Sequence, residues 1–255
     1  MQKPHLSVHK WQVLPLTIAS QQYHIDMSEQ LLAAASPEDP ATLYWSQAEP
    51  AGLVLGFAQK HTILNPALPA QQFPIYHRRA GGTAVLVGPG LLGLDVVLPT
   101  GHPLILPDIV ESYRWLGTLW VKALQLLGVE TRMLSSQEAH AQRDRRKLAE
   151  TRERESILAR ACFGSFSPFE VVAGQRKVVG LDMIRRRAGS LLQAGLLLQW
   201  EIEPLVELLG HTAEEQAILR EGLPERAVGL NTLAGRTVTA EEVIVAFEKA
   251  LITLE

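Results

Sequence analysis

Most apolar residues of this chain occur in short runs, and only a few stretches follow the 3.6-residue period of a helix. The clearest helical stretch spans residues 108–127, with apolar residues Ile109, Tyr113, Leu116, Trp120, Ala123 and Leu127. Pro107 suits the first turn of this predicted helix, and Gly128 suits its end. A second helix is predicted at residues 21–35, with Pro37 beyond its end.

The other apolar runs are short and separated by glycine and proline, which is typical of strands. They predict strands at 42–47, 53–57, 74–79, 83–87, 94–98 and 129–133, a hairpin of 169–173 with 177–184, and a strand or strand pair at 189–200. The turn Glu49-Pro50-Ala51-Gly52 joins the first two of these strands. The strands cluster in hairpins and do not alternate with helices. This favours an α+β fold with a mixed, mainly antiparallel sheet flanked by helices.

The C-terminal part is predicted to be helical, because Thr212 with Glu215 and Thr239 with Glu242 have the spacing of capping boxes. Residues 135–160 are strongly charged with mixed signs, which indicates a solvated helix or a mobile connection. No linker separates two large units. We therefore expect a main domain at 1–203 and a small helical C-terminal extension at 204–255 packed on it.

Composition excludes several classes of function. The 255 residues are 47% hydrophobic and carry a net charge of −3, whereas a nucleic-acid-binding protein is usually basic. One cysteine excludes an intramolecular disulfide, and the histidines lack ligand spacing, so no metal site is predicted. Residues 1–19 show no signal peptide, and 84–106 is too interrupted by proline and glycine to span a membrane. A cytoplasmic protein without nucleic-acid or membrane partners is expected.

The single cysteine, Cys162, is a candidate nucleophile. A lone cysteine is otherwise a small buried apolar residue. Arg160 lies two positions away, and a nearby cation raises the thiolate fraction of a cysteine. No histidine is close in the sequence, so a base would have to come from elsewhere in the fold.

Lys177 is a candidate site residue on the second strand of the predicted hairpin. It could be an exposed strand lysine beside Arg176. Val178 and Val179 follow it without strict alternation, which suits a strand covered on both faces. A lysine pointing inward from such a strand needs a partner, and an acyl carbonyl or a phosphate would serve.

The segment Arg78-Arg79-Ala80-Gly81-Gly82-Thr83 is the third candidate. Two glycines between strands let the backbone approach a ligand closely, and arginines can clamp an anion. An ordinary hairpin turn with surface arginines is the alternative. Gly88-Pro89-Gly90, just after the next short strand, leaves both ends of that strand open and favours a binding site.

These motifs, in this order, resemble the biotin/lipoate protein ligase family and its cysteine-containing octanoyltransferase branch. The segments that carry the resemblance are 26–32, 53–59 with Gly-x-x-Gln, 78–85 with Arg-Arg-x-x-Gly-Gly-x-Ala-Val, 177–180 with Lys-Ile/Val-x-Gly, 190–195 and 234–239. They are spread over nearly the whole chain. Cys162 precedes Lys177 by fifteen residues, which is the spacing of that branch. The resemblance implies the α+β fold of the family, with its catalytic domain at 1–203.

The resemblance implies an octanoyl or lipoyl transferase. Such an enzyme moves a medium-chain acyl group from the thioester of an acyl carrier protein, or from an acylated lipoyl protein, to a lysine of a lipoyl-domain protein. Cys162 would carry the acyl group, and Lys177 with the N–H groups near Gly81 and Gly82 would stabilise the oxyanion. The implied acyl-binding residues are Arg78, Arg79, Gly81, Gly82, Thr83, Val85 and Gly180, and the apolar residues around Val85 and Leu94 would line the acyl tunnel. Thioester-to-amide transfer is downhill and requires no cofactor.

Two alternatives remain open. In an ATP-dependent lipoate–protein ligase, which uses ATP and magnesium, Lys177 would contact an acyl-adenylate and Arg78 or Arg79 a phosphate. A degenerate, non-catalytic family member is the other alternative. It is suggested by departures from the family pattern at Val87, Leu181, Asp182 and Ala194.

Overall fold

The computed structural model describes residues 11–67 and 73–254. Residues 1–10 lie outside the described residues. The expectation that residues 1–19 contain no signal peptide falls partly on them. No helix in the described ranges is long and apolar enough to cross a membrane.

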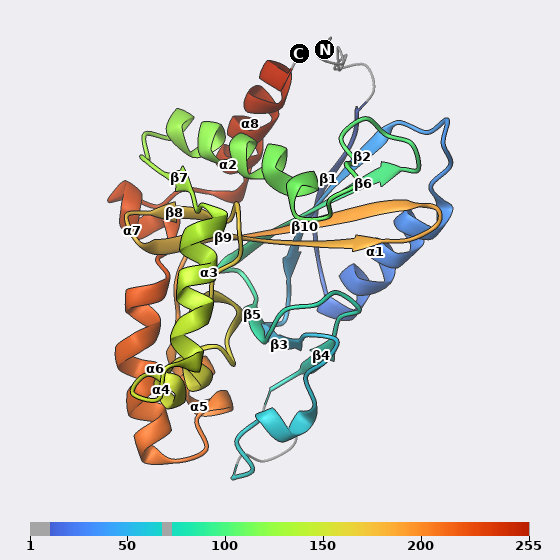
Figure 1. The fold of residues 1–255 in the computed structure, drawn as a ribbon. Coiled ribbons are helices and arrows are strands. Elements are labelled where there is room, and N and C mark those ends of the chain that lie inside the picture. Colours follow the sequence, from blue (N-terminus) through green and yellow to red (C-terminus); the bar gives the residue numbers. More distant parts are fainter. Residues whose placement is uncertain (1–10, 68–72, 255) are drawn as a thin grey trace.

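A seven-stranded sheet forms the centre of the molecule (Figure 1). Its strands are, in spatial order, β1 (Trp11–Ala19), β2 (Ala41–Ala48), β6 (Leu91–Pro99), β10 (Gly189–Leu197), β9 (Arg176–Arg185), β8 (Val171–Ala173) and β7 (Arg132–Met133). Only β1 and β2 are parallel, and every other neighbouring pair in this sheet is antiparallel. The predicted α+β fold with a mixed, mainly antiparallel sheet is therefore confirmed.

A small second sheet lies beside the large one, with β3 (Gly52–Leu55) between β4 (Ile75–His77) and β5 (Val85–Val87). The turn after β2 carries the chain from the large sheet into this one, so β2 and β3 do not pair as a hairpin. All four residues of β3 are buried, which places it at the middle of the small sheet. Residues 78–84, with the two glycines, connect β4 to β5.

Strand β1 was missed by the sequence prediction, which contained no strand before residue 21. The strand contains Pro15, and its register with β2 shifts between Leu14 and Thr17. A proline cannot donate a ladder hydrogen bond, so it is tolerated on an edge strand or at a bulge. Strand β1 is both an edge strand and irregular at that point.

The predicted helices are present, with shifted ends. Helix α1 spans Gln21–Ala34, and α2 spans Arg114–Leu126. Helix α2 begins later than predicted because Glu111–Tyr113 forms a 3₁₀ turn. Gly128 has φ +79°, a left-handed conformation that favours glycine and ends the helix as expected. The charged segment forms α3 (Ser136–Asp144) and α4 (Arg152–Leu158), so its helical interpretation is correct.

The C-terminal part is helical, as predicted. It contains α5 (Glu203–Leu209), α6 (Ala213–Arg226), α7 (Leu230–Ala234) and α8 (Ala240–Leu251). Thr239 and Glu242 form the complete capping box. At α6 the Thr212 side chain accepts from the Glu215 N–H, but the Glu215 carboxylate bonds elsewhere, so this box is only half formed.

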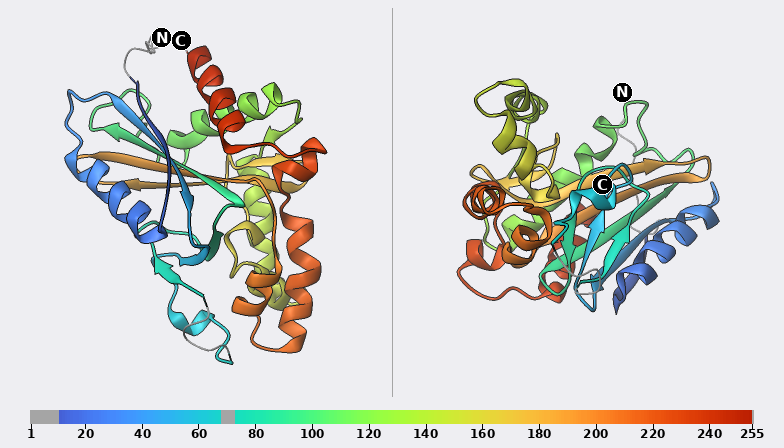
Figure 2. Two further views of the ribbon diagram at one scale, coloured as in Figure 1. Left: turned by 180° about the vertical axis from the view of Figure 1, so that it is seen from behind. Right: turned by 90° about the horizontal axis from the view of Figure 1, so that it is seen from below.

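Helices α2 and α8 cover one face of the large sheet (Figures 1 and 2). Trp45 of β2, Trp120 of α2 and Phe247 of α8 pack together there, with ring centroids 4.8 to 6.0 Å apart. A second core joins α4, α5 and α6 to β3, as Leu158, Leu223 and Leu53 show. Residues on both sides of position 203 thus share both cores, and the division into 1–203 and 204–255 stays a prediction.

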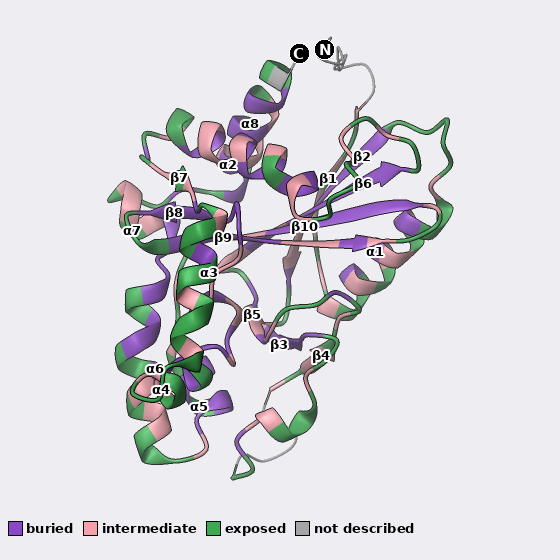
Figure 3. Ribbon diagram, in the orientation of Figure 1, coloured by how far each residue is buried: buried purple, intermediate pink, exposed green. Residues whose placement is uncertain are grey.

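The two faces of the large sheet differ in what they carry. Even-numbered residues of β6, such as Leu92 and Leu94, are fully buried in the core under α2 and α8. Odd-numbered residues Leu91, Gly93 and Asp95 point to the opposite face, because successive side chains of a strand alternate. That opposite face, between the sheet and α1, holds the site. Figure 3 shows most of β6 and of β10, which lie beneath it, as buried.

Candidate active site

A cavity of about 350 Å³ lies between the large sheet, α1, β5 and the segment 162–170. It gathers nearly all predicted site residues, namely Arg78, Arg79, Gly82, Thr83, Val85, Cys162, Lys177 and Gly180. Gly81 is exposed and does not line it. Leu94 lies on the opposite face of β6, so its predicted place in an acyl tunnel is wrong. The four departures from the family pattern, Val87, Leu181, Asp182 and Ala194, all border the cavity, but the Leu181 and Ala194 side chains pack with Leu94 in the core on the other face of the sheet.

The floor of the cavity consists of two cross-strand rows on β6, β10 and β9. Gly93, Gly195 and Gly180 are directly paired and leave the first row without side chains. Asp95, Gln193 and Asp182 form the next row. Two residues along a strand separate the rows, which is about 7 Å. The floor of the cavity therefore has no side chains in the glycine row and polar side chains in the next row.

Cys162 lies at the wall of the cavity and is partly exposed. Its N–H donates to the Ala84 carbonyl over 2.7 Å, and the Ala84 N–H donates to the Arg160 carbonyl over 3.0 Å. These two hydrogen bonds attach the cysteine segment to the glycine-containing segment just before β5. Cys162 is thus not enclosed in the core, which the nucleophile interpretation requires.

Gly164 holds the cysteine turn, residues 162–164, against α4. A Cβ atom at this position would collide with the carbonyl oxygen of Leu158. The close approach therefore requires glycine. This close contact determines how near residues 162–164 lie to α4.

Lys177 points inward, as predicted, with only 1% of its surface exposed. Its ammonium donates to the Cys162 carbonyl (2.9 Å), the Ser165 carbonyl (2.7 Å) and the Glu170 carboxylate (3.0 Å). An ammonium has three N–H donors, and all three are engaged. The expected partner, an acyl carbonyl or a phosphate, is replaced by residues of the chain itself.

Glu170 is the counter-ion that the sequence prediction missed. It is 3% exposed, and its Oε2 accepts from the Ser167 N–H over 2.7 Å. Burial raises the pKa of Glu170, and the Lys177 ammonium opposes that shift. An acidic residue between Phe169 and Val171, at the start of a buried strand, was the available signal.

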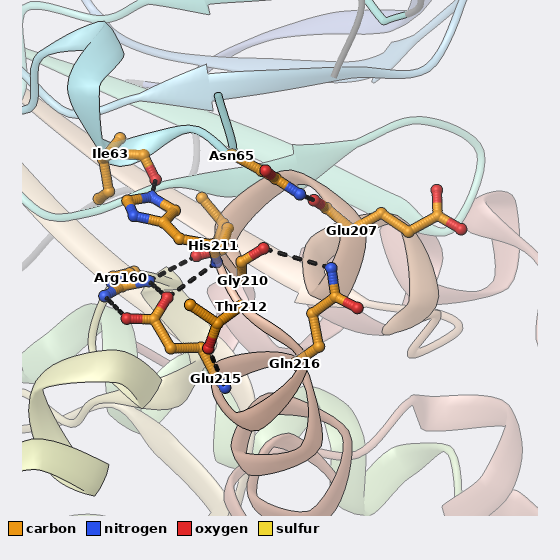
Figure 4. Close-up of polar contacts among 10 residues, drawn as sticks. Ile63, Asn65, Arg160, Glu207, Gly210, His211, Thr212, Glu215 and Gln216 are labelled. Atoms are coloured by element: carbon orange, nitrogen blue, oxygen red, sulfur yellow. Dashed lines mark hydrogen bonds and ion pairs between the residues drawn. The ribbon is translucent and has the colours of Figure 1, made fainter. Parts of the chain in front are cut away.

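Arg160 has a different role from the expected one. Its guanidinium forms two hydrogen bonds to the Glu215 carboxylate of α6, one of 2.7 Å, and donates to the Leu209 carbonyl (Figure 4). These bonds from Arg160 lower the pKa of Glu215 to about 2. Arg160 does not line the cavity, so its charge is balanced by α6 and is not offered to the thiol. The expectation that it activates Cys162 is wrong.

A buried polar cluster at the α1 side of the cavity was also missed. Asp95 accepts from Gln193 Nε2 over 2.9 Å and contacts the Ser28 hydroxyl, which itself lies 2.7 Å from the His24 carbonyl. A hydroxyl has one proton, so a protonated Asp95 lets both contacts of Ser28 be hydrogen bonds. Burial raises the pKa of Asp95 to about 6, although the bonds from Ser28 and Gln193 oppose the shift. The signal was a carboxylate inside the apolar run 94–98.

His24 lines the same cavity but is not available as a base in this arrangement. Its Nδ1 lies 2.7 Å from the Tyr44 hydroxyl, and its Nε2 lies 2.9 Å from the Gln47 carbonyl. Both ring nitrogens are therefore engaged, and burial lowers the pKa of His24. These contacts fit a neutral imidazole that donates from Nε2 to the carbonyl.

An Asp95→Asn variant tests the neutral carboxyl. The folded-state pKa of about 6 lies above the ordinary value of 3.8, so the free energy of unfolding falls as pH rises from about 4 to about 6. Asparagine cannot ionise and keeps both hydrogen-bond directions. We expect the stability of the variant relative to wild type to increase by roughly 2–3 kcal/mol between pH 4 and pH 7. Urea unfolding at several pH values measures this, with Asp26→Asn on the exposed side of α1 as control; a pH-independent difference would contradict it.

Arg78 faces the departure residue Asp182 across the cavity. Arg78 Nη2 lies 3.9 Å from Asp182 Oδ2, and no hydrogen bond reaches Arg78 Nε or Asp182 Oδ2 from the described residues. Arg79 pairs with Glu29 over 3.2 Å. Both arginines of the predicted anion clamp thus already have a carboxylate partner. Within the described ranges, no group of three or more His, Cys, Asp or Glu side chains is arranged to hold a metal ion.

The fold and the cavity correspond to a known class of protein. Residues 20–252 match the family model of the lipoyl protein ligase A/B catalytic domain, and the chain belongs to this family. The chain is similar to the octanoyltransferase LipM of Exiguobacterium sibiricum, with 31% identity over 95% of this chain and 86% of the relative. It is 30% identical to the octanoyltransferase LipM of Kyrpidia tusciae, over 91% and 82% of the two chains.

Solved structures share the fold at lower identity. Protein Ta0514 of T. acidophilum with bound lipoic acid has a TM-score of 0.67 at 18% identity, over 94% of this chain and 82% of that one. Lipoate-protein ligase A bound with ATP has a TM-score of 0.67 at 17% identity, over 95% and 83% of the two chains. The resemblance to the biotin/lipoate protein ligase family and its octanoyltransferase branch is therefore confirmed.

Proposed function

We propose that this protein is an octanoyltransferase that moves a medium-chain acyl group from a thioester to a lysine of a lipoyl domain through an acyl-Cys162 intermediate. Acyl transfer is supported by the LipM relatives, which match most of the chain. The observation that carries the covalent route is the position of Cys162. Cys162 lines the cavity and is partly exposed, while its carbonyl is held by Lys177.

The transfer takes place in two exchanges. The Cys162 thiolate attacks the thioester carbonyl, the bond between that carbon and the donor sulfur breaks, and the donor leaves as a thiol with the proton that Cys162 gave up. The amine of the acceptor lysine then attacks the acyl-cysteine. The carbon–sulfur bond breaks, the amide forms, and Cys162 regains a proton from the amine. A thioester supplies the free energy, so no ATP is consumed.

Lys177 acts first as a positioning residue in this proposal. Its three donors hold Cys162, Ser165 and Glu170, so none is directed at a ligand. Stabilisation of the oxyanion by Lys177 requires that one of these contacts be exchanged for the substrate oxygen. Among the backbone groups proposed for the oxyanion, Gly82 lines the cavity and Gly81 does not.

The electrostatics of the cavity favour the thioester route over the ATP-dependent ligase. A phosphate at Arg78 would compete with Asp182 and be repelled by it, because like charges at short range disfavour each other. Leu181 and Ala194 lie in one cross-strand row with Leu94, and their side chains pack in the core under α2 and α8. The departure at Asp182 thus supports a change of substrate handling, and we propose that the departures do not mark loss of activity.

The partners of this reaction follow from its chemistry. An acyl carrier protein or an acylated lipoyl protein is the proposed donor, and a lipoyl-domain protein is the proposed acceptor. A cytoplasmic location, without nucleic-acid or membrane partners, stays a prediction.

Intact-mass measurement tests the proposed function. Wild-type protein incubated with octanoyl carrier protein is expected to gain one octanoyl group, and Cys162→Ala is expected to gain none. Octanoate with ATP and magnesium should give no adduct and no octanoyl-adenylate. An adduct that persists in Cys162→Ala would overturn the mechanism, and adenylate formation would indicate the ligase. Protein that accepts no donor would indicate a non-catalytic family member.

A further inference from the structure

Two arginines of the charged segment line the same cavity as Cys162. Arg143 ends α3, and Arg146 belongs to the 3₁₀ turn Arg145–Lys147 that follows it. The sequence prediction assigned this segment to solvated surface. Arg143 is indeed exposed and Arg146 is half-buried, but both contribute to the wall of the site.

Neither guanidinium is held in place, although Asp144 lies near Arg143 and Glu155 near Arg146. No hydrogen bond or ion pair joins the Arg143 or Arg146 side chain to another residue that the structure describes. Burial lowers the pKa of Arg146; nearby Glu155 opposes that shift, and the Arg143 and Arg226 charges add to it. A half-buried cation beside two like charges favours the approach of an anion.

The other charges around this wall are already balanced. The Glu155 carboxylate forms a buried ion pair with Arg226, and the Glu170 carboxylate forms one with Lys177. On the far side, Asp182 faces Arg78. Asp144, next to Arg143, pairs with Lys147. Among the described residues, Arg143 and Arg146 therefore leave an excess of positive charge at one side of the cavity, although the whole chain has a net charge of −3.

The arginines lie at the outer part of the site. Helix α3 packs on β8 through Ala139 and Val172, beside Phe166 of the cysteine segment, and Figure 1 draws α3 in front of β8 and β9. Exposure decreases from Arg143 through Cys162 to Lys177, which is fully buried. Arg143 is thus the most exposed residue of this wall, and Arg146 is half-buried like Cys162.

We propose that Arg143 and Arg146 form an anion subsite for the phosphate ester on the thioester-bearing arm of the acyl donor. This inference rests on the proposed function. A carrier protein presents its acyl group on a phosphopantetheine arm, with the thioester at one end and a phosphate at the other. When the thioester reaches Cys162, the phosphate stays nearer the mouth of the cavity. Guanidinium groups bind phosphate oxygens through strong, charge-assisted hydrogen bonds.

The subsite selects between the two donors that the chemistry allows. An acylated lipoyl lysine has no phosphate on its arm, so it gains nothing from the two arginines. A phosphopantetheine thioester carries a phosphate and is therefore bound more tightly by the two arginines. The subsite thus assigns the donor role to a phosphorylated carrier arm and leaves the unphosphorylated lysine arm as the acceptor.

Two small donors that differ only in the phosphate test this subsite. The rate of acyl-enzyme formation is measured with S-octanoyl-4′-phosphopantetheine and with S-octanoyl-pantetheine, using intact mass. Wild-type protein is expected to show a kcat/KM roughly 10- to 100-fold higher for the phosphorylated donor. This advantage should shrink as ionic strength rises. The double variant Arg143→Gln/Arg146→Gln should lose the advantage, so that its kcat/KM is equal for the two donors.

A matched double variant provides the control. Arg145 and Lys147 are exposed in the same turn and do not line the cavity, so Arg145→Gln/Lys147→Gln removes the same charge and should keep the advantage. Equal rates for the two donors in wild type, or an advantage that survives in Arg143→Gln/Arg146→Gln, would overturn the subsite alone. Absence of an adduct with either donor overturns the proposed function together with the subsite. ATP-dependent adenylate formation that is lost in Arg143→Gln/Arg146→Gln assigns the arginines to a nucleotide and overturns the proposal.

Discussion

Replacement of Lys177 by methionine is expected to lower the free energy of unfolding by about 3–5 kcal/mol. The change leaves the Glu170 carboxylate at 3% exposure without its ammonium partner, and an unpaired buried charge is costly. It also frees the carbonyls of Cys162 and Ser165 from the donor that joins them. Acyl-enzyme formation should therefore fall together with stability. Denaturant unfolding and intact-mass kinetics on the same variant measure the two effects.

A second variant separates these effects. In Lys177→Met/Glu170→Met both charges are removed, and replacing a buried ion pair with apolar residues of similar volume is often neutral for stability. We expect most of the lost stability to return while acyl-enzyme formation stays low, because nothing then holds the Cys162 carbonyl. Lys147→Met at the exposed Lys147–Asp144 pair should leave the unfolding midpoint unchanged. Recovery of both stability and activity in the double variant would refute a positioning role for Lys177.

The Gly164→Ala variant is expected to form the acyl-enzyme roughly 100-fold more slowly than wild type. The added methyl group meets the Leu158 carbonyl oxygen, which belongs to the backbone and cannot swing aside. The cysteine turn must then move away from α4, and a displacement of about 1 Å is enough to misalign a nucleophile. The single-turnover rate with octanoyl carrier protein measures the effect.

A glycine with room for a side chain provides the comparison. At Gly90 an added Cβ would lie 3.6 Å from its nearest neighbours, which is an ordinary contact. Gly90→Ala should therefore keep the wild-type rate. If Gly164→Ala also kept that rate, the close contact with Leu158 would not determine where the thiol lies.

Features that depend on neighbouring residues were predictable from the sequence. Gly128 ends α2 and Thr239 begins α8 because a left-handed glycine and a capping box are local devices. The β8–β9 hairpin turns at Gly174, which has φ +61°. The lack of alternation after Lys177 favoured its inward direction, although an exposed strand lysine was the alternative. The segments that carry Cys162, Lys177 and the two glycines were all recognised from short motifs.

Features that depend on distant partners were not predictable. The pairing of β2 with β6, and not with β3, joins residues about 50 positions apart, and the turn between β2 and β3 gave no sign of it. Glu170 was missed because only the fold places it against Lys177, and Asp95 because its partner Ser28 lies 67 positions away. Arg160 was misinterpreted because Glu215 lies 55 positions downstream. In each case the sequence showed the charged residue but did not show which residue would neutralise it.

The tie between Arg160 and Glu215 limits how this chain can be trimmed or recombined. The carbonyl of Arg160 accepts a hydrogen bond from the Ala84 N–H, just before β5, while its side chain is bonded to Glu215 of α6, more than fifty residues later. A truncated chain that ends before α6 would lose this ion pair together with the core residues of α6 and α8. A change confined to Glu215 is therefore expected to appear first as slower acyl-enzyme formation, even though no described residue after Gly195 lines the cavity.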